Sequence, residues 1–392
     1  MKRPAFGLQR VVFALVVAAF TNIYLTQPVL PVLRSEFGVT EAGASLTISM
    51  VILGIALSNL PFGRLADRYP IRPIIFAGGT AVIAGGLAAA LTRDFTLLIA
   101  ARFLQGLFMP ALTTCLAAHL ANSLPADRLN VVMGSYVSAT VVGGLGGRLL
   151  GGLIHGRWNW RYAFVAASLL LLLAMIAAFI GLPEERPRPA GSSEEIGYLK
   201  LLSAWRRLGI YAVAFASFWV FSSTFNYMPF YLSGPPFHAS TSLITLLYLS
   251  YLIGALIGPV AGKLADRIGN GAAMALGAAT FGAALVASLV GTLLAVMASL
   301  AGICLGFFTT HASAAGALNG MTSASRGRAN ALYVLSYYVG GYAGITVSGY
   351  AYRYAGWPAV VLLGLLVLLV PICAGLAEMA SRQRPGDRGG AA

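Results

Sequence analysis

The sequence predicts an all-α polytopic membrane protein, with twelve transmembrane helices arranged as two six-helix bundles. Three observations predict this class. The 392 residues are 58% hydrophobic and only 10% charged, whereas soluble domains carry about 25% charged residues. Twelve stretches are long and apolar enough to cross a bilayer, and a six-residue motif recurs at equivalent places in the two halves of the chain.

Each predicted span follows from its length and apolar composition. A spanning helix needs about 20 mainly apolar residues, because a hydrocarbon core about 30 Å thick is crossed at about 1.5 Å per residue. Backbone polar groups cannot face lipid unpaired, so these stretches are helices. We predict spans near 11–33, 43–62, 74–92, 96–118, 129–153, 162–182, 208–230, 243–262, 271–290, 293–317, 329–351 and 357–377. The first exceeds the apolar region of a signal peptide, so we keep it as a helix.

Residues 183–207 interrupt the apolar pattern with Pro183, Pro187 and Pro189, a Gly-Ser-Ser run and many charged residues. This composition is typical of a linker. We therefore predict an N-terminal six-helix bundle over 1–182, a cytoplasmic linker over 183–207, and a C-terminal six-helix bundle with a short cytoplasmic tail over 208–392.

The net charge of +14 is explained by membrane topology. With both termini cytoplasmic, 19 of the 26 Lys and Arg residues fall in cytoplasmic segments, which is the positive-inside pattern of inner-membrane proteins. The lipid bilayer is thus the expected partner, and nucleic acid is not. Aromatic residues near the outer surface are predicted to form an interfacial belt, comprising Trp158, Trp160, Tyr162, Tyr352, Tyr354 and Trp357.

The sequence shows no residue pattern that is typical of an enzyme active site. Cys115, Cys304 and Cys373 lie singly inside apolar spans, and the four histidines are scattered along the chain. Neither pattern has the spacing of a metal site or of a catalytic motif. We predict no metal, no cofactor and no enzymatic activity.

The two halves of the sequence repeat one another. Gly-Arg-Leu-Ala-Asp-Arg at 63–68 follows the second span, and Gly-Lys-Leu-Ala-Asp-Arg at 262–267 follows the eighth. Small residues recur every four positions in the fifth and eleventh spans, at Gly143, Gly147, Gly151 and at Gly340, Gly344, Ser348, a spacing that lets helices approach closely. Parallel six-helix repeats predict a pseudo-two-fold axis along the membrane normal, with a solute site between the halves.

The repeated motif, with Arg72 beyond its first copy, resembles the signature loop of the major facilitator superfamily, and the resemblance covers nearly the whole chain. The fifth span is similar to the antiporter motif of that family's exporters, through Gly134, Gly143, Gly147, Gly151 and Gly152. Arg148 stands where the motif has proline. The amino-acid sequences of the first and fifth spans resemble those of the bacterial twelve-helix efflux branch, described as arabinose-efflux-like or YnfM-like.

The resemblance implies a gating latch at the cytoplasmic ends of the second and eighth spans. Its residues would be Gly63, Asp67, Arg68, Arg72, Gly262, Asp266 and Arg267. A carboxylate there can face the positive N-terminus of a neighbouring helix. The alternative is a solvated loop that only sets topology.

Arg102 and Arg148 are the basic residues placed well inside the predicted spans. Each costs about 2.5–3.5 kcal/mol on insertion scales, so either it snorkels outward or it binds an anionic group or holds an outer gate. His311 is the best titrating group inside a span, and it and Asp67 are the candidates for proton coupling. Asp266 is an alternative proton site, and a lone histidine is commonly structural.

Polar and aromatic side chains of the spans are the candidates for a substrate cavity, and packing is the alternative for each tyrosine. They are Asn22, Tyr24, Gln27, Arg102, Gln105, Asn226, Tyr227, Tyr248, Tyr251, His311, Tyr337 and Tyr338.

The resemblance implies a secondary active transporter of the bacterial inner membrane that works by alternating access. The expected activity is proton-coupled antiport by a monomer, with drugs, sugars or metabolites exported. The alternative is an importer or exchanger of an anionic solute bound by Arg102 and Arg148, which the lack of an acid inside the predicted spans favours.

Overall fold

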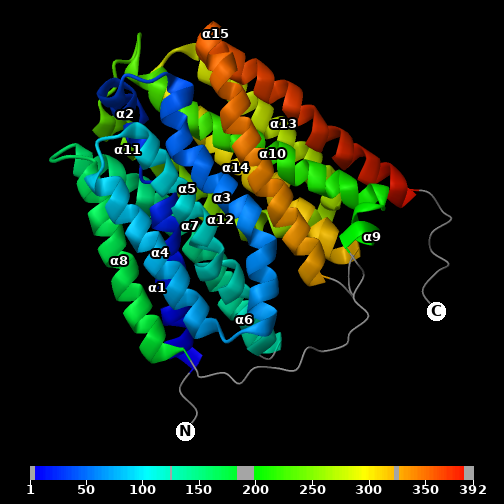
Figure 1. Cartoon of the computed structure of the whole chain (residues 1–392). Coiled ribbons are helices and arrows are strands. Elements are labelled where there is room, and N and C mark those ends of the chain that lie inside the picture. The colour runs from blue at the N-terminus through cyan, green and yellow to red at the C-terminus, as the bar shows by residue number, and fades with distance from the viewer. Residues whose placement is uncertain (1–4, 124–125, 183–197, 322–325, 384–392) are drawn as a thin grey trace. The chain divides into compact units, whose positions relative to one another are not determined.

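The computed structural model describes residues 5–123, 126–182, 198–321 and 326–383 (Figure 1). Within these ranges the side chains of some helical residues, Asp67 among them, lie outside the described part. Every regular element of the described chain is a helix. The all-α class predicted from the sequence is therefore confirmed.

The N-terminal half supplies six predicted spans. The first is a broken helix made of α1 (Ala5–Ile23), the 3-10 turn η1 (Gln27–Val29) and α2 (Leu30–Phe37). The others are α3 (Glu41–Arg68), α4 (Ile71–Leu91), α5 with α6 (Phe95–Leu112 and Thr114–Ser123), α7 (Ala126–His155) and α8 (Arg161–Gly181).

The C-terminal half supplies the other six. After the short α9 (Tyr198–Leu202) come α10 (Trp205–Ser233), then α11 (Thr241–Leu247), η2 (Tyr248–Ser250) and α12 (Tyr251–Ile268), which together form the eighth span. They are followed by α13 (Asn270–Ala287) with η3 (Ser288–Val290), α14 (Leu293–Met321) and α15 (Arg326–Gln383). The last two spans are joined in α15 across a kink at Ala355 and Gly356, where Gly356 has φ 65°.

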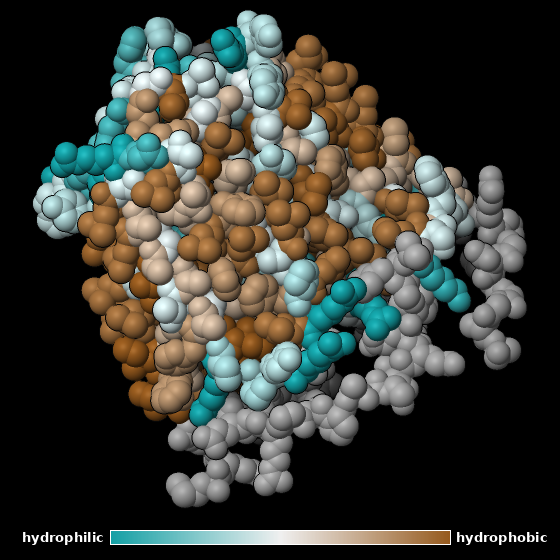
Figure 2. Space-filling model, in the orientation of Figure 1, coloured by the Kyte–Doolittle hydropathy of each residue, from teal (hydrophilic) through white to brown (hydrophobic). Residues whose placement is uncertain are grey.

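Apolar side chains on the outside of the bundle identify the surface that faces lipid. Along α8, exposed residues include Leu169, Leu173, Phe179 and Ile180. Figure 2 shows hydrophobic residues over this side of the protein, with hydrophilic residues at its ends. A helix apolar around its whole circumference is typical of a membrane span.

The same glycine contact recurs in both halves. A Cβ placed on Gly143 or Gly147 of α7 would overlap the backbone of Val17 or Thr21 in α1. The equivalent glycines of α15, Gly340 and Gly344, stand equally close to the backbone of α10 at Phe215 and Trp219. Residues without a Cβ therefore let the first and fifth spans of each half approach backbone to backbone, as the four-residue spacing predicts.

Contacts divide the chain into two compact units. One contains residues 1–193 together with Phe225–Leu249, and the other contains residues 194–224 and Ser250–Ala392. The segment Phe225–Leu249 follows the linker in the sequence but packs with the N-terminal half. The bundle boundaries given above from sequence composition stay a prediction.

The repeated motifs are helical rather than loops, which corrects the expectation that they follow their spans. Residues 63–68 form the last turns of α3, and residues 262–267 lie inside α12. Arg, Leu and Ala favour a helix. The first helix ends at Arg68, because the next residue, Tyr69, precedes Pro70 and therefore disfavours the helical conformation. The second ends at Ile268 and is followed by Gly269, with φ 87°.

The prediction of an aromatic belt is wrong for two of its residues. Trp158, Tyr162 and Tyr354 are exposed, as expected, but Trp160 and Trp357 are almost fully buried. Each buried indole donates a hydrogen bond, Trp160 to Glu36 Oε2 at 2.6 Å and Trp357 to Ser288 Oγ at 2.9 Å. A buried indole N–H requires such an acceptor.

Candidate functional site

Arg102 lies at the break in the first span. Because α1 ends at Ile23, the carbonyls of its last turn have no intrahelical donors. The Arg102 guanidinium supplies donors in their place: Nη1 donates to Asn22 O at 2.8 Å and Nη2 to Ile23 O at 2.5 Å. Its Nε donates to Thr47 O of α3 at 2.8 Å.

Gln105 and Asn22 complete this buried network. Arg102 Nη1 donates to Gln105 Oε1 at 2.6 Å, and Gln105 Nε2 donates to Val82 O of α4 at 3.1 Å. All three predicted cavity residues have no exposed surface. Arg102 therefore joins α1, α3 and α5 within the protein, and its described hydrogen bonds go to protein carbonyl oxygens.

Arg148 forms a second cationic centre, in α7. Its Nε donates to Gln27 Oε1 at 2.6 Å and its Nη1 to Gly144 O at 2.7 Å. The guanidinium carbon lies 3.9 Å from the ring centroid of Tyr24 and 5.4 Å from that of Tyr248, which are cation–π distances. Three predicted cavity residues, Tyr24, Gln27 and Tyr248, thus meet at Arg148.

The segment Phe225–Leu249 is fixed to the N-terminal half by further polar contacts. Asn226 Nδ2 donates to Ser45 Oγ of α3 at 2.7 Å, and both residues are buried. Thr245 of α11 lies against Gly152 of α7, where a Cβ would overlap its side chain. The glycines of the antiporter-like motif therefore contact two elements: Gly143, Gly147 and Gly151 contact α1 and its end, and Gly152 contacts α11.

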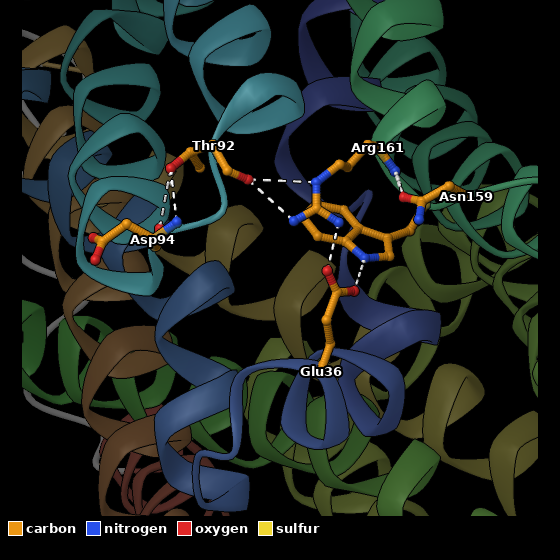
Figure 3. Close-up of polar contacts among 6 residues, drawn as sticks. Glu36, Thr92, Asp94, Asn159 and Arg161 are labelled. Atoms are coloured by element: carbon orange, nitrogen blue, oxygen red, sulfur yellow. Dashed lines mark hydrogen bonds and ion pairs between the residues drawn. The ribbon is translucent and has the colours of Figure 1, made fainter.

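Glu36 ties together one end of this unit (Figure 3). Its carboxylate accepts from Arg161 Nη1 at 2.5 Å and from the Trp160 indole at 2.6 Å. Arg161 also donates from Nη2 to Thr92 O at 3.0 Å, so Figure 3 shows its guanidinium between Glu36 and Thr92. Asp94 is directed elsewhere, and caps α5 by accepting from Leu97 N at 2.7 Å.

In the other unit, His311 lies among aromatic rings. Its Nδ1 is 2.9 Å from the Tyr333 hydroxyl, and its ring is 5.7 Å from Phe307 and 5.3 Å from Tyr337. Tyr337 in turn stacks on Phe218 at 3.6 Å. Two further predicted cavity residues also contact aromatic rings. The ring centroid of Tyr338 lies 5.4 Å from that of Tyr337, and the ring centroid of Tyr251 lies 5.4 Å from that of Phe221.

The predicted latch residues are only partly described. Arg68, Asp266 and Arg267 are exposed at the ends of α3 and α12. Arg72 donates to Leu182 O and lies 5.7 Å from the Phe179 ring, so it caps the end of α8. The Asp67 side chain and the surroundings of Gly134 lie outside the described part of the structure.

Several contributors to these sites were missed from the sequence. Ser45, Thr47 and Thr245 are small hydroxyl residues whose roles depend on a distant partner, and no spacing indicates them. Phe218 and Phe307 read as packing residues. A stronger signal was available for Glu378, an acid at the end of an apolar stretch, which is buried and paired with Arg206 at 3.0 Å.

The broken first span, the glycine contacts repeated in both halves and the buried polar network define a polytopic helical transport protein. Comparison with known families agrees: the Major Facilitator Superfamily sequence model matches residues 12–309 and 234–390. The chain belongs to this superfamily, and its fold is the twelve-helix fold of the family.

Similar proteins indicate which branch of the superfamily this chain resembles. The inner membrane transport protein YnfM of Escherichia coli strain K12 is 29% identical over 385 residues, covering 96% of this chain and 92% of YnfM. A multidrug resistance protein B homolog of Mycobacterium tuberculosis is 32% identical over 168 residues, covering 43% of this chain and 31% of that protein. The human organic anion transporter MFSD10 shares the fold, with a TM-score of 0.72 and 18% identity over 95% of this chain and the whole of that one. The predicted YnfM-like assignment is confirmed.

Proposed function

We propose that this transport protein is a proton-coupled antiporter that exports small organic molecules by alternating access. The observation that carries the proposal is the packing of the antiporter-like motif. Gly143, Gly147 and Gly151 each stand against a backbone carbonyl of the first span, so the motif is used as a close helix contact. The partial similarity to a multidrug resistance protein supports small organic molecules as the substrate class.

Alternating access requires contacts that form on one side of the membrane and separate in the other state. The contacts of Phe225–Leu249 with the N-terminal half suit this role, because they join a segment that follows the linker to the first half, through polar pairs such as Asn226 with Ser45 and a close contact of Thr245 with Gly152. With cytoplasmic termini, as the distribution of Lys and Arg supports, they lie on the periplasmic side. We assign them as the outer closure, formed by Asn226 with Ser45, Tyr248 with Arg148, and Thr245 with Gly152.

Two groups remain candidates for proton coupling. His311 is held by Tyr333 within the aromatic cluster, and imidazole changes charge at physiological pH. The direction of this hydrogen bond depends on the tautomer, but in the protonated ring both nitrogens are donors, so the Tyr333 hydroxyl would then have to accept. Asp67 remains the alternative.

Import or exchange of an anionic solute is the competing function. The hydrogen bonds of Arg102 to Asn22, Ile23, Thr47 and Gln105 argue against its binding a solute. Uptake assays with matched anionic, neutral and cationic compounds separate the two functions. If the anionic compound is transported faster than the matched neutral and cationic compounds, the anionic-solute function is favoured over export of neutral or cationic compounds.

Asp67→Asn is expected to lower transport about tenfold, because a latch that loses about 1.4 kcal/mol of differential stabilisation shifts the state equilibrium by that factor. Transport is measured in proteoliposomes, and membrane insertion by fluorescence size exclusion, which should be unchanged. Asp94→Asn is the matched control, since asparagine still caps α5. Wild-type rates in Asp67→Asn would rule out the latch.

The direction of transport can be tested in cells that lack other exporters. Expression of this chain should raise resistance to a panel of toxic organic compounds, and a collapsed pH gradient should remove the protection. Increased sensitivity on expression would indicate import.

A further inference from the structure

A cavity lies at the end of the second unit, where four apolar helices begin or end. It has a volume of about 580 Å³ and is lined by residues that include Trp205, Arg206, Arg207, Asn270 and Glu378. Trp205 begins α10, Asn270 begins α13, and Glu378 lies near the end of α15. A cavity at the common end of several spans is at the level where lipid headgroups meet the protein.

Arg206 and Glu378 give this cavity a fixed polar wall. Arg206 Nη2 donates to both carboxylate oxygens of Glu378, at 3.0 and 3.1 Å. Glu378 is buried, whereas the Arg206 side chain is 48% exposed. In the described contacts of Arg206, the donors Nε and Nη1 take no protein acceptor, so they are available to a ligand.

Arg207 adds a second oriented guanidinium. Its Nε and Nη2 donate to Leu201 O and Lys200 O at the end of α9, at 3.0 and 2.9 Å. These bonds hold the side chain in place while Nη1 takes no acceptor in the described contacts. Among the described residues that line the cavity, two arginines stand against one carboxylate.

The surroundings of the cavity are apolar and exposed. Trp205 is 81% exposed, and the same helix ends expose Leu208, Leu376 and Met379. An exposed tryptophan beside arginines at the end of a span is typical of the membrane interface. A ligand here would therefore present an anion to the arginines and an apolar body to the neighbouring helix surfaces.

We propose that this cavity binds the phosphate headgroup of an anionic phospholipid from the cytoplasmic leaflet. Arginine binds phosphate oxygens through its planar set of donors, and basic cavities between helix ends on the cytoplasmic side suit anionic headgroups. The inference is independent of the substrate and of the direction of transport. A soluble phosphate ion is the other source of the same chemistry, and it would gain nothing from the apolar surroundings.

The test is native mass spectrometry of the detergent-purified full chain, titrated with phosphatidylglycerol or phosphatidylcholine. We expect preferential binding of phosphatidylglycerol by the wild type. The double variant Arg206→Gln/Arg207→Gln should bind it about 25-fold more weakly, at about fivefold per arginine near the surface. The matched control Arg64→Gln/Lys263→Gln removes the same charge from exposed sites and should change affinity less than about twofold.

Two further measurements keep the outcome decisive. Arg206→Lys/Arg207→Lys retains the charge but not the planar donor set, so its affinity for phosphatidylglycerol should lie between those of the wild type and the glutamine pair, and it tests the proposal if the glutamine pair is unstable. The proposal would be overturned if Arg206→Gln/Arg207→Gln and Arg64→Gln/Lys263→Gln weakened lipid binding equally. It would also be overturned if Arg206→Gln/Arg207→Gln left the affinity unchanged. Displacement of the lipid by excess inorganic phosphate would instead assign the cavity to a soluble anion.

Discussion

Arg102→Leu is expected to abolish folded protein in the membrane. The substitution removes four buried hydrogen bonds and leaves the Asn22 and Ile23 carbonyl oxygens and Gln105 Oε1 without their donor, whereas the Thr47 carbonyl keeps its donor within α3. Each buried group left unsatisfied costs about 1–3 kcal/mol, so the combined loss approaches the whole stability of a typical domain, about 5–15 kcal/mol. Fluorescence size exclusion after mild solubilisation should show aggregate in place of the monodisperse peak.

Arg93→Leu is the matched control, because Arg93 is exposed just before α5. It should elute as the wild type does. A monodisperse Arg102→Leu protein with normal thermal unfolding but no transport would contradict the structural role and favour solute binding by this arginine.

Gly152→Val is expected to lower transport at least tenfold while the protein still folds. The valine Cβ would overlap the Thr245 side chain, and overpacking costs about 1–3 kcal/mol. Because Thr245 belongs to the proposed outer closure, we expect α11 to move away from α7, which relieves the overlap. Proteoliposome flux measures the first effect. Labelling of Ile244→Cys, at a position of α11 that is buried, with a membrane-impermeant maleimide in a background without Cys115, Cys304 and Cys373 measures the second and should increase.

Gly146→Val provides the control on the same helix. A Cβ there would meet only Thr21 Oγ1, at 3.5 Å, which is ordinary contact. Flux and labelling should therefore stay near wild type. Unchanged labelling in Gly152→Val would show that this contact does not belong to a closure.

The fold could be predicted because its signals are local. Apolar length predicts spans without knowledge of their neighbours, and the repeated motifs at 63–68 and 262–267 relate the halves. The glycines at 143 and 147 also carried a correct prediction, since the spacing of small residues on one helix indicates a close neighbour. Which helix that neighbour is came from the structure, where it is α1.

The site was less predictable because its chemistry joins distant residues. Arg102 reads as an expensive intramembrane charge, and its role follows only once the break at Ile23 and the position of α3 are known. Trp160 reads as an interfacial residue because the sequence does not show Glu36 beside it. Gly152 was named as part of a motif, but Thr245, its partner, carries no motif at all.

The most direct test of the proposed mechanism is solute flux in proteoliposomes of the purified protein, measured with and without an imposed pH gradient. Proton-coupled antiport predicts that an outward-directed proton gradient drives accumulation of the solute inside the vesicle and that an uncoupler abolishes this accumulation. It also predicts that solute entry alkalinises the lumen in proportion, because protons leave in exchange. Flux that is the same with and without the gradient, and that moves no protons, would contradict it.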